Sequence, residues 1–205
     1  MTRKIISIKN LSSKVKTAKQ QGKKIVHCHG VFDLLHIGHI KHFNEAKCHG
    51  DILVVTVTPD EYVNKGPNRP AFTTELRLEA LAALESIDFV AKNEWSTAVK
   101  TIKQIKPDIY FKGPDYKDNK DDVTGMISEE SRAIESVGGE IMYSTDIAFS
   151  SSSILNRYSD LYSEEQKSFI SRIRHETGPE DVKTVLEALS GLKVITIVFC
   201  YTKDY

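Results

Sequence analysis

Apolar residues recur in two patterns along this chain, at helical spacing and in short apolar runs, and these patterns predict alternating helices and strands. Residues 1–22 carry apolar side chains at helical spacing, and Gly22 stands where such a helix would end. Residues 23–29 and 51–58 are short apolar runs, and the second is nearly continuous, as in a strand covered on both faces. Apolar positions at helical spacing also occupy the stretch between the two runs. The apolar positions of the two predicted helices are Ile8, Leu11, Val15 and Ala18, then Ile37, Ile40, Phe43 and Ala46.

The same alternation continues to residue 143. Further helices are predicted from Thr73–Glu75, with a hydroxyl cap, and from Trp95 to Pro107, and another ends before Gly138. Strands are predicted at 88–91, 109–111 and 140–143. Strands that alternate with helices imply a parallel sheet with right-handed crossovers. We therefore expect an α/β fold: a Rossmann-like, open, parallel five-stranded sheet with helices on both faces.

The last part of the chain follows a different pattern. Helices are predicted at 163–175 and 180–189, and a strongly β-type strand at 194–199. We expect two domains, one at 1–158 and a short C-terminal appendage of helices and one strand at 159–205. An uncovered strand promotes aggregation, so we expect the appendage to pack on a partner subunit or on the sheet edge.

Composition excludes several classes of protein. The 205 residues hold 28 basic and 28 acidic side chains, so the net charge argues against general nucleic-acid or membrane-surface binding. Three irregularly spaced cysteines do not make a disulfide framework. No charged-then-apolar leader opens the chain and no apolar run approaches the length of a membrane span, so we expect a cytoplasmic protein.

The stretch from His29 to His39 carries the candidate chemistry. It lies where a strand turns into a helix, and Gly30 lacks a Cβ, so backbone can approach a ligand there. The start of a helix offers N–H groups and partial positive charge, which suit phosphate. His36 and His39 share one face of the first helical turn, on either side of Gly38. This combination indicates phosphoryl or nucleotidyl chemistry.

Two other interpretations of this region stay open. The histidines could be ordinary surface residues, and Asp33 could simply accept hydrogen bonds from turn amides. Zinc is the rival chemistry, because six histidines and two cysteines crowd residues 27–49, although no third ligand completes a recognisable zinc spacing.

The ten residues from Gly30 to His39 read Gly-x-Phe-Asp-x-x-His-x-Gly-His. This run resembles the nucleotidyltransferase superfamily with a His-x-Gly-His motif, in its cytidylyltransferase-like branch. That branch includes glycerol-3-phosphate cytidylyltransferase and the adenylyltransferase domain of bacterial ADP-heptose synthase, and the match covers about residues 5–158. The resemblance implies that His36 and His39 are catalytic. It also implies nucleotide binding by Gly30, Val31, Phe32, Asp33 and Gly38.

The resemblance extends to residues that follow later strands. Lys65, in a Gly- and Pro-rich loop that also holds Arg69, would be catalytic by clamping phosphates, and Arg77 would bind phosphate or pack a helix. The segment Lys112-Gly113-Pro114-Asp115-Tyr116 resembles the heptose branch, with Lys112 catalytic and with Gly113 and Asp115 binding nucleotide. Plain solvated lysines are the alternative for Lys65 and Lys112.

Residues 150–153 form a run of serines that aligns with the family's hydroxyl-rich segment at the start of its last helix. It implies nucleotide binding by Ser150, Ser151 and Ser152, with a linker as the alternative. The glycerol-phosphate branch has an arginine just before this segment. Residues 144–146 read Ser-Thr-Asp here, which favours the heptose branch.

The resemblance implies that a nucleoside triphosphate, ATP or CTP, is joined to a sugar phosphate with release of pyrophosphate, most like heptose 1-phosphate adenylyltransferase. Mg²⁺ is expected with the nucleotide, with no protein ligand assigned, and a homodimer is expected. The appendage resembles the start of a ribokinase-type sugar kinase domain but is too short to be one. The alternatives are a glycerol-3-phosphate-type cytidylyltransferase, with a polyol phosphate as acceptor, and a nucleotide-binding regulatory or scaffolding module.

Overall fold

The computed structural model describes residues 3–65, 69–114 and 126–145, together with residues 165, 168–169 and 171–172. The chain divides into two units, Met1–Leu155 and Asn156–Tyr205, and the elements below belong to the first. The predicted domain boundary after residue 158 stays a prediction.

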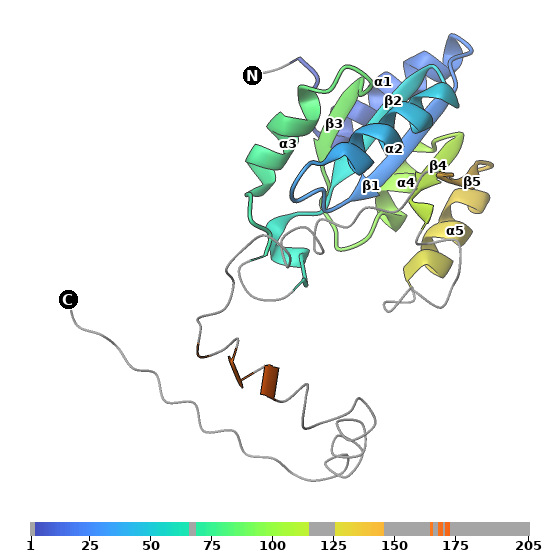
Figure 1. The fold of residues 1–205 in the computed structure, drawn as a ribbon. Helices are drawn as coiled ribbons and strands as arrows, with labels where there is room; N and C mark the ends of the chain where they lie inside the picture. The colour runs from blue at the N-terminus through green and yellow to red at the C-terminus, as the bar shows by residue number, and fades with distance from the viewer. Residues whose placement is uncertain are drawn as a thin grey trace. The chain divides into compact units, whose positions relative to one another are not determined.

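Helices and strands alternate along the first unit, as the apolar pattern predicts (Figure 1). A short 3₁₀ helix, η1 (Asp60–Tyr62), follows the second strand. The helices are α1 (Ile8–Gln20), α2 (Ile37–Cys48), α3 (Thr74–Ala82), α4 (Val99–Ile105) and α5 (Met126–Ser136). The strands are β1 (Ile25–Gly30), β2 (Ile52–Val57), β3 (Phe89–Lys92), β4 (Ile109–Lys112) and β5 (Glu140–Tyr143).

The five strands form one parallel sheet in the order β3-β2-β1-β4-β5. The predicted fold class is therefore confirmed. The chain winds outward from β1 in one direction and then, from β4, in the other. In open sheets of this kind ligands bind beyond the carboxyl ends of the strands where the winding reverses. That position lies between the ends of β1 and β4, directly beside the motif at Gly30–His39.

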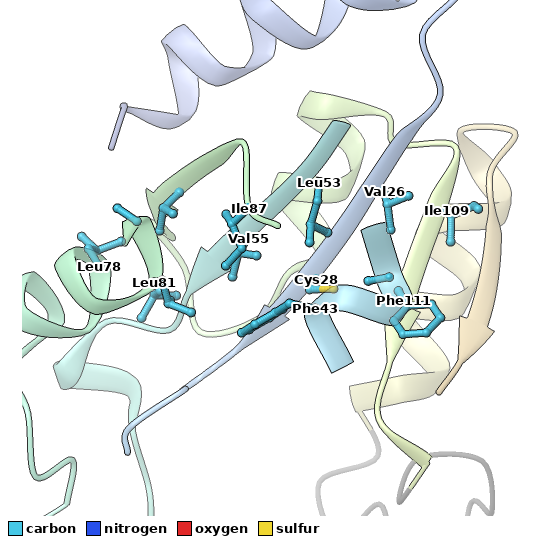
Figure 2. Packing of buried hydrophobic residues seen from close by; sticks show 14 residues of the cluster. Val26, Cys28, Phe43, Leu53, Val55, Leu78, Leu81, Ile87, Ile109 and Phe111 are labelled. Carbon is cyan, nitrogen blue, oxygen red and sulfur yellow. The ribbon is translucent and has the colours of Figure 1, made fainter. Parts of the chain in front are cut away.

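Helices α2 and α3 cover one face of the sheet, and an apolar cluster fills the space between them and the strands (Figure 2). Phe43 of α2 and Leu81 of α3 are fully buried there against the central strands. The strand residues of this layer include Val26, Cys28, Leu53, Val55, Ile109 and Phe111.

Helices α1, α4 and α5 cover the opposite face, where side chains of alternate strand positions point. The predicted stripe of α1 is confirmed, because Ile8, Leu11, Val15 and Ala18 are all buried. Near the carboxyl ends of the strands this layer becomes polar, since His27, Thr56 and Lys112 are buried on it.

Two helices differ in detail from their apolar patterns. Of the four apolar positions of α2, Phe43 and Ala46 are buried, whereas Ile37 and Ile40 are 54% and 37% exposed. The predicted helix from Trp95 begins only at Val99. The reason is Asn93, whose side-chain amide donates to the carbonyl oxygens of Trp95 and Thr97 and holds that stretch as a loop.

The start of α3 also differs from the prediction. The Thr73 hydroxyl makes no capping hydrogen bond. The carboxylate of Asp60, from η1, accepts from the Thr74 N–H at 3.0 Å instead. The cap therefore comes from a residue distant in sequence.

Little of the second unit is described. Glu165, Ser168, Phe169, Ser171 and Arg172 are helical, in agreement with the predicted helix at 163–175. The helix predicted at 180–189 and the strand at 194–199 lie outside the described residues. Within the described part of the chain, no helix has the length and apolar character needed to cross a membrane.

Substitution of Gly50 by alanine tests how closely the start of β2 packs on β1. The added Cβ would lie 2.7 Å from Val26 Cγ2 and 2.8 Å from the Lys24 carbonyl oxygen, and the backbone contact cannot relax cheaply. We expect Gly50→Ala to lower the free energy of unfolding by about 1–3 kcal/mol in urea titrations. The control is Asn44→Ala, an exposed position on α2, which should stay within about 0.5 kcal/mol of the parent. Equal stability of Gly50→Ala and the parent would contradict the close contact.

Candidate active site

The first turn of α2 is capped by a histidine. His36 is the N-cap residue, with extended backbone angles, and its Nδ1 accepts from the Gly38 N–H at 3.1 Å. A ring nitrogen that accepts carries no proton, so the proton of neutral His36 lies on Nε2. The Gly38 N–H expected to bind phosphate is thus used inside the protein, and its bond fixes the orientation of the His36 ring.

The two motif imidazoles are in contact, with their planes tilted. The ring centroids of His36 and His39 are 3.9 Å apart with 30° between the planes, and Phe32 contacts His39 edge-on at 5.6 Å. Burial and the charges of His36, His42 and Lys65 lower the pKa of His39 to about 3, and burial lowers the pKa of His36. Without nucleotide both rings are therefore neutral near pH 7. Adjacent phosphate would shift them toward the cation.

The turn between β1 and α2 is conformationally unusual. Phe32 has a φ of 48°, in the left-handed region that side chains other than glycine seldom adopt. This angle places the Phe32 ring over Gly30, where an added Cβ would lie 3.0 Å from the ring. The space expected to admit a ligand at Gly30 is thus filled by Phe32. The glycine is needed for this packing.

Asp33 fastens a second loop to the motif. One carboxylate oxygen accepts from the N–H groups of Ala71 and Phe72, and the other accepts from Arg69 Nε at 2.7 Å. Burial alone would raise the pKa of Asp33, but these two N–H groups and Arg69 outweigh it and lower the pKa. Asp33 therefore binds amides, as its alternative interpretation states, although the amides belong to the loop after η1.

This fastening brings two cations to the motif. The Arg69 side chain is only 9% exposed, and its Nη2 is a buried donor with no partner among the described residues. Burial and the charge of Arg69 lower the pKa of Lys65, whose own charge acts on His39. The two cations and both imidazoles therefore gather around one small region, which is suited to an anion of high charge.

Arg77 makes hydrogen bonds to the protein from all three of its nitrogens. Its Nε donates to the Phe72 carbonyl, Nη1 to that of Val31, and Nη2 to three oxygens around η1 and α3. The side chain is fully buried. Of the two roles that the sequence left open, the geometry favours packing over phosphate binding.

Lys112 lies at the carboxyl end of β4 but is buried and ion-paired. Its Nζ lies 3.0 Å from an oxygen of Glu130 on α5, and both side chains are less than a tenth exposed. Gly113 follows directly, outside the strand. The alternative of a plain solvated lysine therefore does not apply to Lys112, and its catalytic role stays a prediction.

Four predicted site residues lie outside the described residues, and their predicted roles stay predictions. They are Asp115, Ser150, Ser151 and Ser152.

Sequence reasoning missed Glu130 and Asp60. Glu130 gives no signal, because it adjoins the exposed Glu129 in an ordinary amphipathic helix. Asp60 could have been suspected, since its Pro-Asp pair ends β2 just before a basic loop.

Metal ligands are a separate question. In residues 3–65, 69–114 and 126–145, no three His, Cys, Asp or Glu side chains gather so that they could hold a metal ion. The zinc alternative thus finds no ligand set in these ranges.

An open parallel sheet with imidazoles and cations at the carboxyl edge beside its winding reversal defines a Rossmann-like nucleotide-binding protein. The profile of one family, described as cytidylyltransferase-like, matches residues 27–157. The chain belongs to this cytidylyltransferase-like family. The predicted family and enzyme class, a nucleotidyltransferase, are confirmed. Such enzymes generally use a divalent metal.

Curated relatives carry the name bifunctional protein HldE. The protein from Sulfurimonas denitrificans is 42% identical over 128 residues, which are 62% of this chain and 27% of that protein. The one from Geobacter metallireducens is 34% identical over 165 residues, 79% of this chain and 32% of that protein. The chain thus spans about a quarter to a third of the length of these relatives.

Two solved structures share the fold. A lipopolysaccharide core biosynthesis protein from Thermoplasma volcanium is 30% identical with a TM-score of 0.52, and the match covers 62% of this chain and all of that one. A pantoate–β-alanine ligase from Francisella tularensis, in complex with an ATP analogue and β-alanine, has a TM-score of 0.55 over 95% of this chain and 89% of that one. At 14% identity the second likeness concerns the fold alone.

The buried imidazoles predict that acid destabilises the fold. Burial lowers the pKa of His27 well below its ordinary value, that of His29 and His42 to about 4, and that of His39 to about 3. Unfolded histidine has a pKa of about 6.5, so between about pH 4 and 6.5 the unfolded chain binds more protons. The free energy of unfolding should therefore fall as pH falls from 6.5, by up to about 1.4 kcal/mol per pH unit for each fully buried ring.

Urea unfolding at pH 7, 6 and 5 measures this loss, and an NMR titration follows each ring. The carboxylates with lowered pKa, such as Asp33, lose their stabilisation only at more acid pH, below about 4. Rings that titrate at about pH 6.5 in the folded chain would contradict the burial of these imidazoles.

Proposed function

We propose that this chain transfers a nucleotidyl group from ATP or CTP to a sugar phosphate and releases pyrophosphate, most like a heptose 1-phosphate adenylyltransferase. The observation that carries the proposal is the pair of His36 and His39 rings, 3.9 Å apart at the carboxyl edge of the sheet. Lys65 and the buried Nη2 of Arg69, which has no partner among the described residues, lie in the same region and suit a triphosphate. Similarity to a lipopolysaccharide core biosynthesis protein supports a sugar as the acceptor.

The reaction needs little covalent help from the protein. An acceptor phosphate oxygen, already an anion near neutral pH, attacks the α-phosphorus in line, and the bond to pyrophosphate breaks. The difficulty is the meeting of two polyanions, so catalysis consists of positioning and of stabilising charge on the α and β phosphates. Nε2 of His36 is a donor for this purpose, held in place because Nδ1 accepts from Gly38. His39, stacked on that ring, contributes the second imidazole.

We propose that the divalent ion is Mg²⁺ and that it arrives on the triphosphate. Phosphate oxygens are ligands that Mg²⁺ prefers. The described part of the site fits this arrangement, because it supplies imidazoles and cations, and both oxygens of Asp33 already accept hydrogen bonds. Bound there, the ion would neutralise part of the phosphate charge.

A glycerol-3-phosphate-type cytidylyltransferase remains the second candidate. The segment that begins at Ser144 lacks the arginine of that branch, which favours the first candidate. A purely nucleotide-binding module is the third, and the intact paired imidazoles argue against it. The homodimer stays a prediction, which light scattering of the purified chain would test.

Pyrophosphate release is the assay that separates these candidates. We expect release when the full chain is given ATP and Mg²⁺ with a heptose or hexose 1-phosphate. Release only with CTP and glycerol 3-phosphate would replace the first proposal by the second. No release with any pair from a panel of sugar and polyol phosphates, although nucleotide binds, would favour the binding module.

Replacement of His39 tests the assigned chemistry. Because it removes an imidazole at the proposed phosphate site, His39→Ala should lower kcat by about 100-fold or more, with the fold retained by circular dichroism. The control is His49→Ala, an imidazole at the far end of the same helix, about 15 Å away along its axis. That control should keep near-parental turnover. Near-parental turnover of His39→Ala would refute the role of the imidazole pair.

A further inference from the structure

A carboxylate that the sequence does not single out joins three elements beneath the proposed site. Oε1 of Glu130 accepts from the Ala98 N–H at the start of α4, at 3.1 Å. Its Oε2 accepts from the Tyr110 hydroxyl at 2.8 Å and from Lys112 Nζ at 3.0 Å. Glu130, on α5, thus connects that helix to α4 and to the last half of β4. Its side chain is 6% exposed.

This ion pair belongs to a buried polar layer on the α4 and α5 face of the sheet. Thr56 on β2 bonds the rings of His27 at 2.8 Å and His29 at 2.9 Å, and the His27 ring lies 5.2 Å from that of Tyr110. Burial alone would raise the pKa of Glu130, but the charges of Lys112 and His29 and its hydrogen bonds lower it, so the carboxylate stays ionised. The layer therefore crosses β2, β1 and β4 directly below the edge where the winding reverses.

Stability does not account for such a layer. A buried ion pair costs desolvation, and well-packed apolar residues in its place are often as stable or more stable. The opposite face of this same sheet is built in that apolar way. What the pair supplies is a fixed geometry, because each of its hydrogen bonds requires a defined position of the Lys112 side chain and of the carboxyl end of β4.

We propose that Glu130 is a positioning residue for nucleotide binding, which acts by holding Lys112 and the strand end that precedes Gly113 in the geometry that the nucleotide meets. The inference rests on the proposed function, since it assigns a nucleotide to this edge of the sheet. It goes beyond the predicted catalytic role of Lys112, because it assigns the position of the lysine to a carboxylate of α5.

The test compares two neighbouring glutamates of α5. Glu130→Gln keeps the shape of the side chain and an acceptor for Ala98 but removes the charge. Glu129→Gln makes the same chemical change at an exposed position. Affinity of the full chain for a non-hydrolysable ATP or CTP analogue with Mg²⁺ is measured by calorimetry, and the melting temperature is recorded alongside. We expect Glu130→Gln to weaken nucleotide binding about tenfold and Glu129→Gln to leave it unchanged.

A double-mutant cycle with Lys112→Met separates positioning from general destabilisation. If Glu130 acts through Lys112, the double variant binds nucleotide no more weakly than Lys112→Met alone. Should Glu130→Gln fail to fold, Tyr110→Phe removes the hydroxyl that donates to the same carboxylate oxygen and accepts from Lys112 Nζ at 3.3 Å, and it leaves both charges. It should then weaken nucleotide binding about threefold at an unchanged melting temperature.

Each outcome decides between the two proposals. Unchanged affinity in Glu130→Gln, or in Tyr110→Phe when that variant carries the test, overturns the positioning role, as do additive effects in the cycle. Normal pyrophosphate release by the parent then leaves the proposed function intact. A parent that binds nucleotide but releases no pyrophosphate, with Glu130→Gln weakened, overturns the function and supports the positioning role. A parent that binds neither ATP nor CTP overturns both.

Discussion

The buried guanidinium of Arg77 joins the segments that make up the carboxyl edge of the sheet. It donates to the turn after β1 at Val31, to the end of β2 at Thr58 and to Asp60 of η1, while its own backbone belongs to α3. Burial of a charge costs several kcal/mol unless the charge is paired and hydrogen-bonded, and here Asp60 and four further oxygens offset that cost. The position of the motif turn follows from this arrangement, because the Val31 carbonyl lies one residue before Phe32 with its positive φ.

The two faces of the sheet do different work. On the α2 and α3 face, apolar packing holds the motif helix rigidly against β1 through Phe43 and Ala46, so the first turn of α2 projects from a fixed base. On the other face, the polar layer of His29, Lys112 and Glu130 lies below the same edge. The candidate site therefore rests on apolar packing from the α2 and α3 face and on hydrogen bonds between buried polar groups from the other face. Asp33 adds the third support, since it draws Arg69 and its loop onto the motif.

Particular residues show how far sequence reasoning reaches. The five strands, their order of appearance and the motif helix could be predicted, because apolar periodicity reports burial directly. Ile37 and Ile40 fit the same periodicity but remain 54% and 37% exposed in the first turn of α2. Trp95 fits a helical stripe, yet it lies in a loop because the Asn93 amide donates to the carbonyl oxygens of Trp95 and Thr97. Lys112 is the last residue of its strand, one position beyond the predicted end, while its partner Glu130 is 18 residues further along and has no pattern that marks it.

By itself, the sequence determined the α/β alternation, the parallel sheet and the ten-residue motif from Gly30 to His39, because local periodicity and a contiguous motif are written in neighbouring residues. The tertiary structure alone decided which polar groups are already engaged. It made His36 a helix cap, bonded all three nitrogens of Arg77 to protein oxygens and paired Lys112 with Glu130. It also left a donor of Arg69 with no partner in the part of the chain that the structure describes. The reason is that hydrogen bonds between residues far apart in sequence depend on where the chain brings each atom in space, and no local pattern encodes that position.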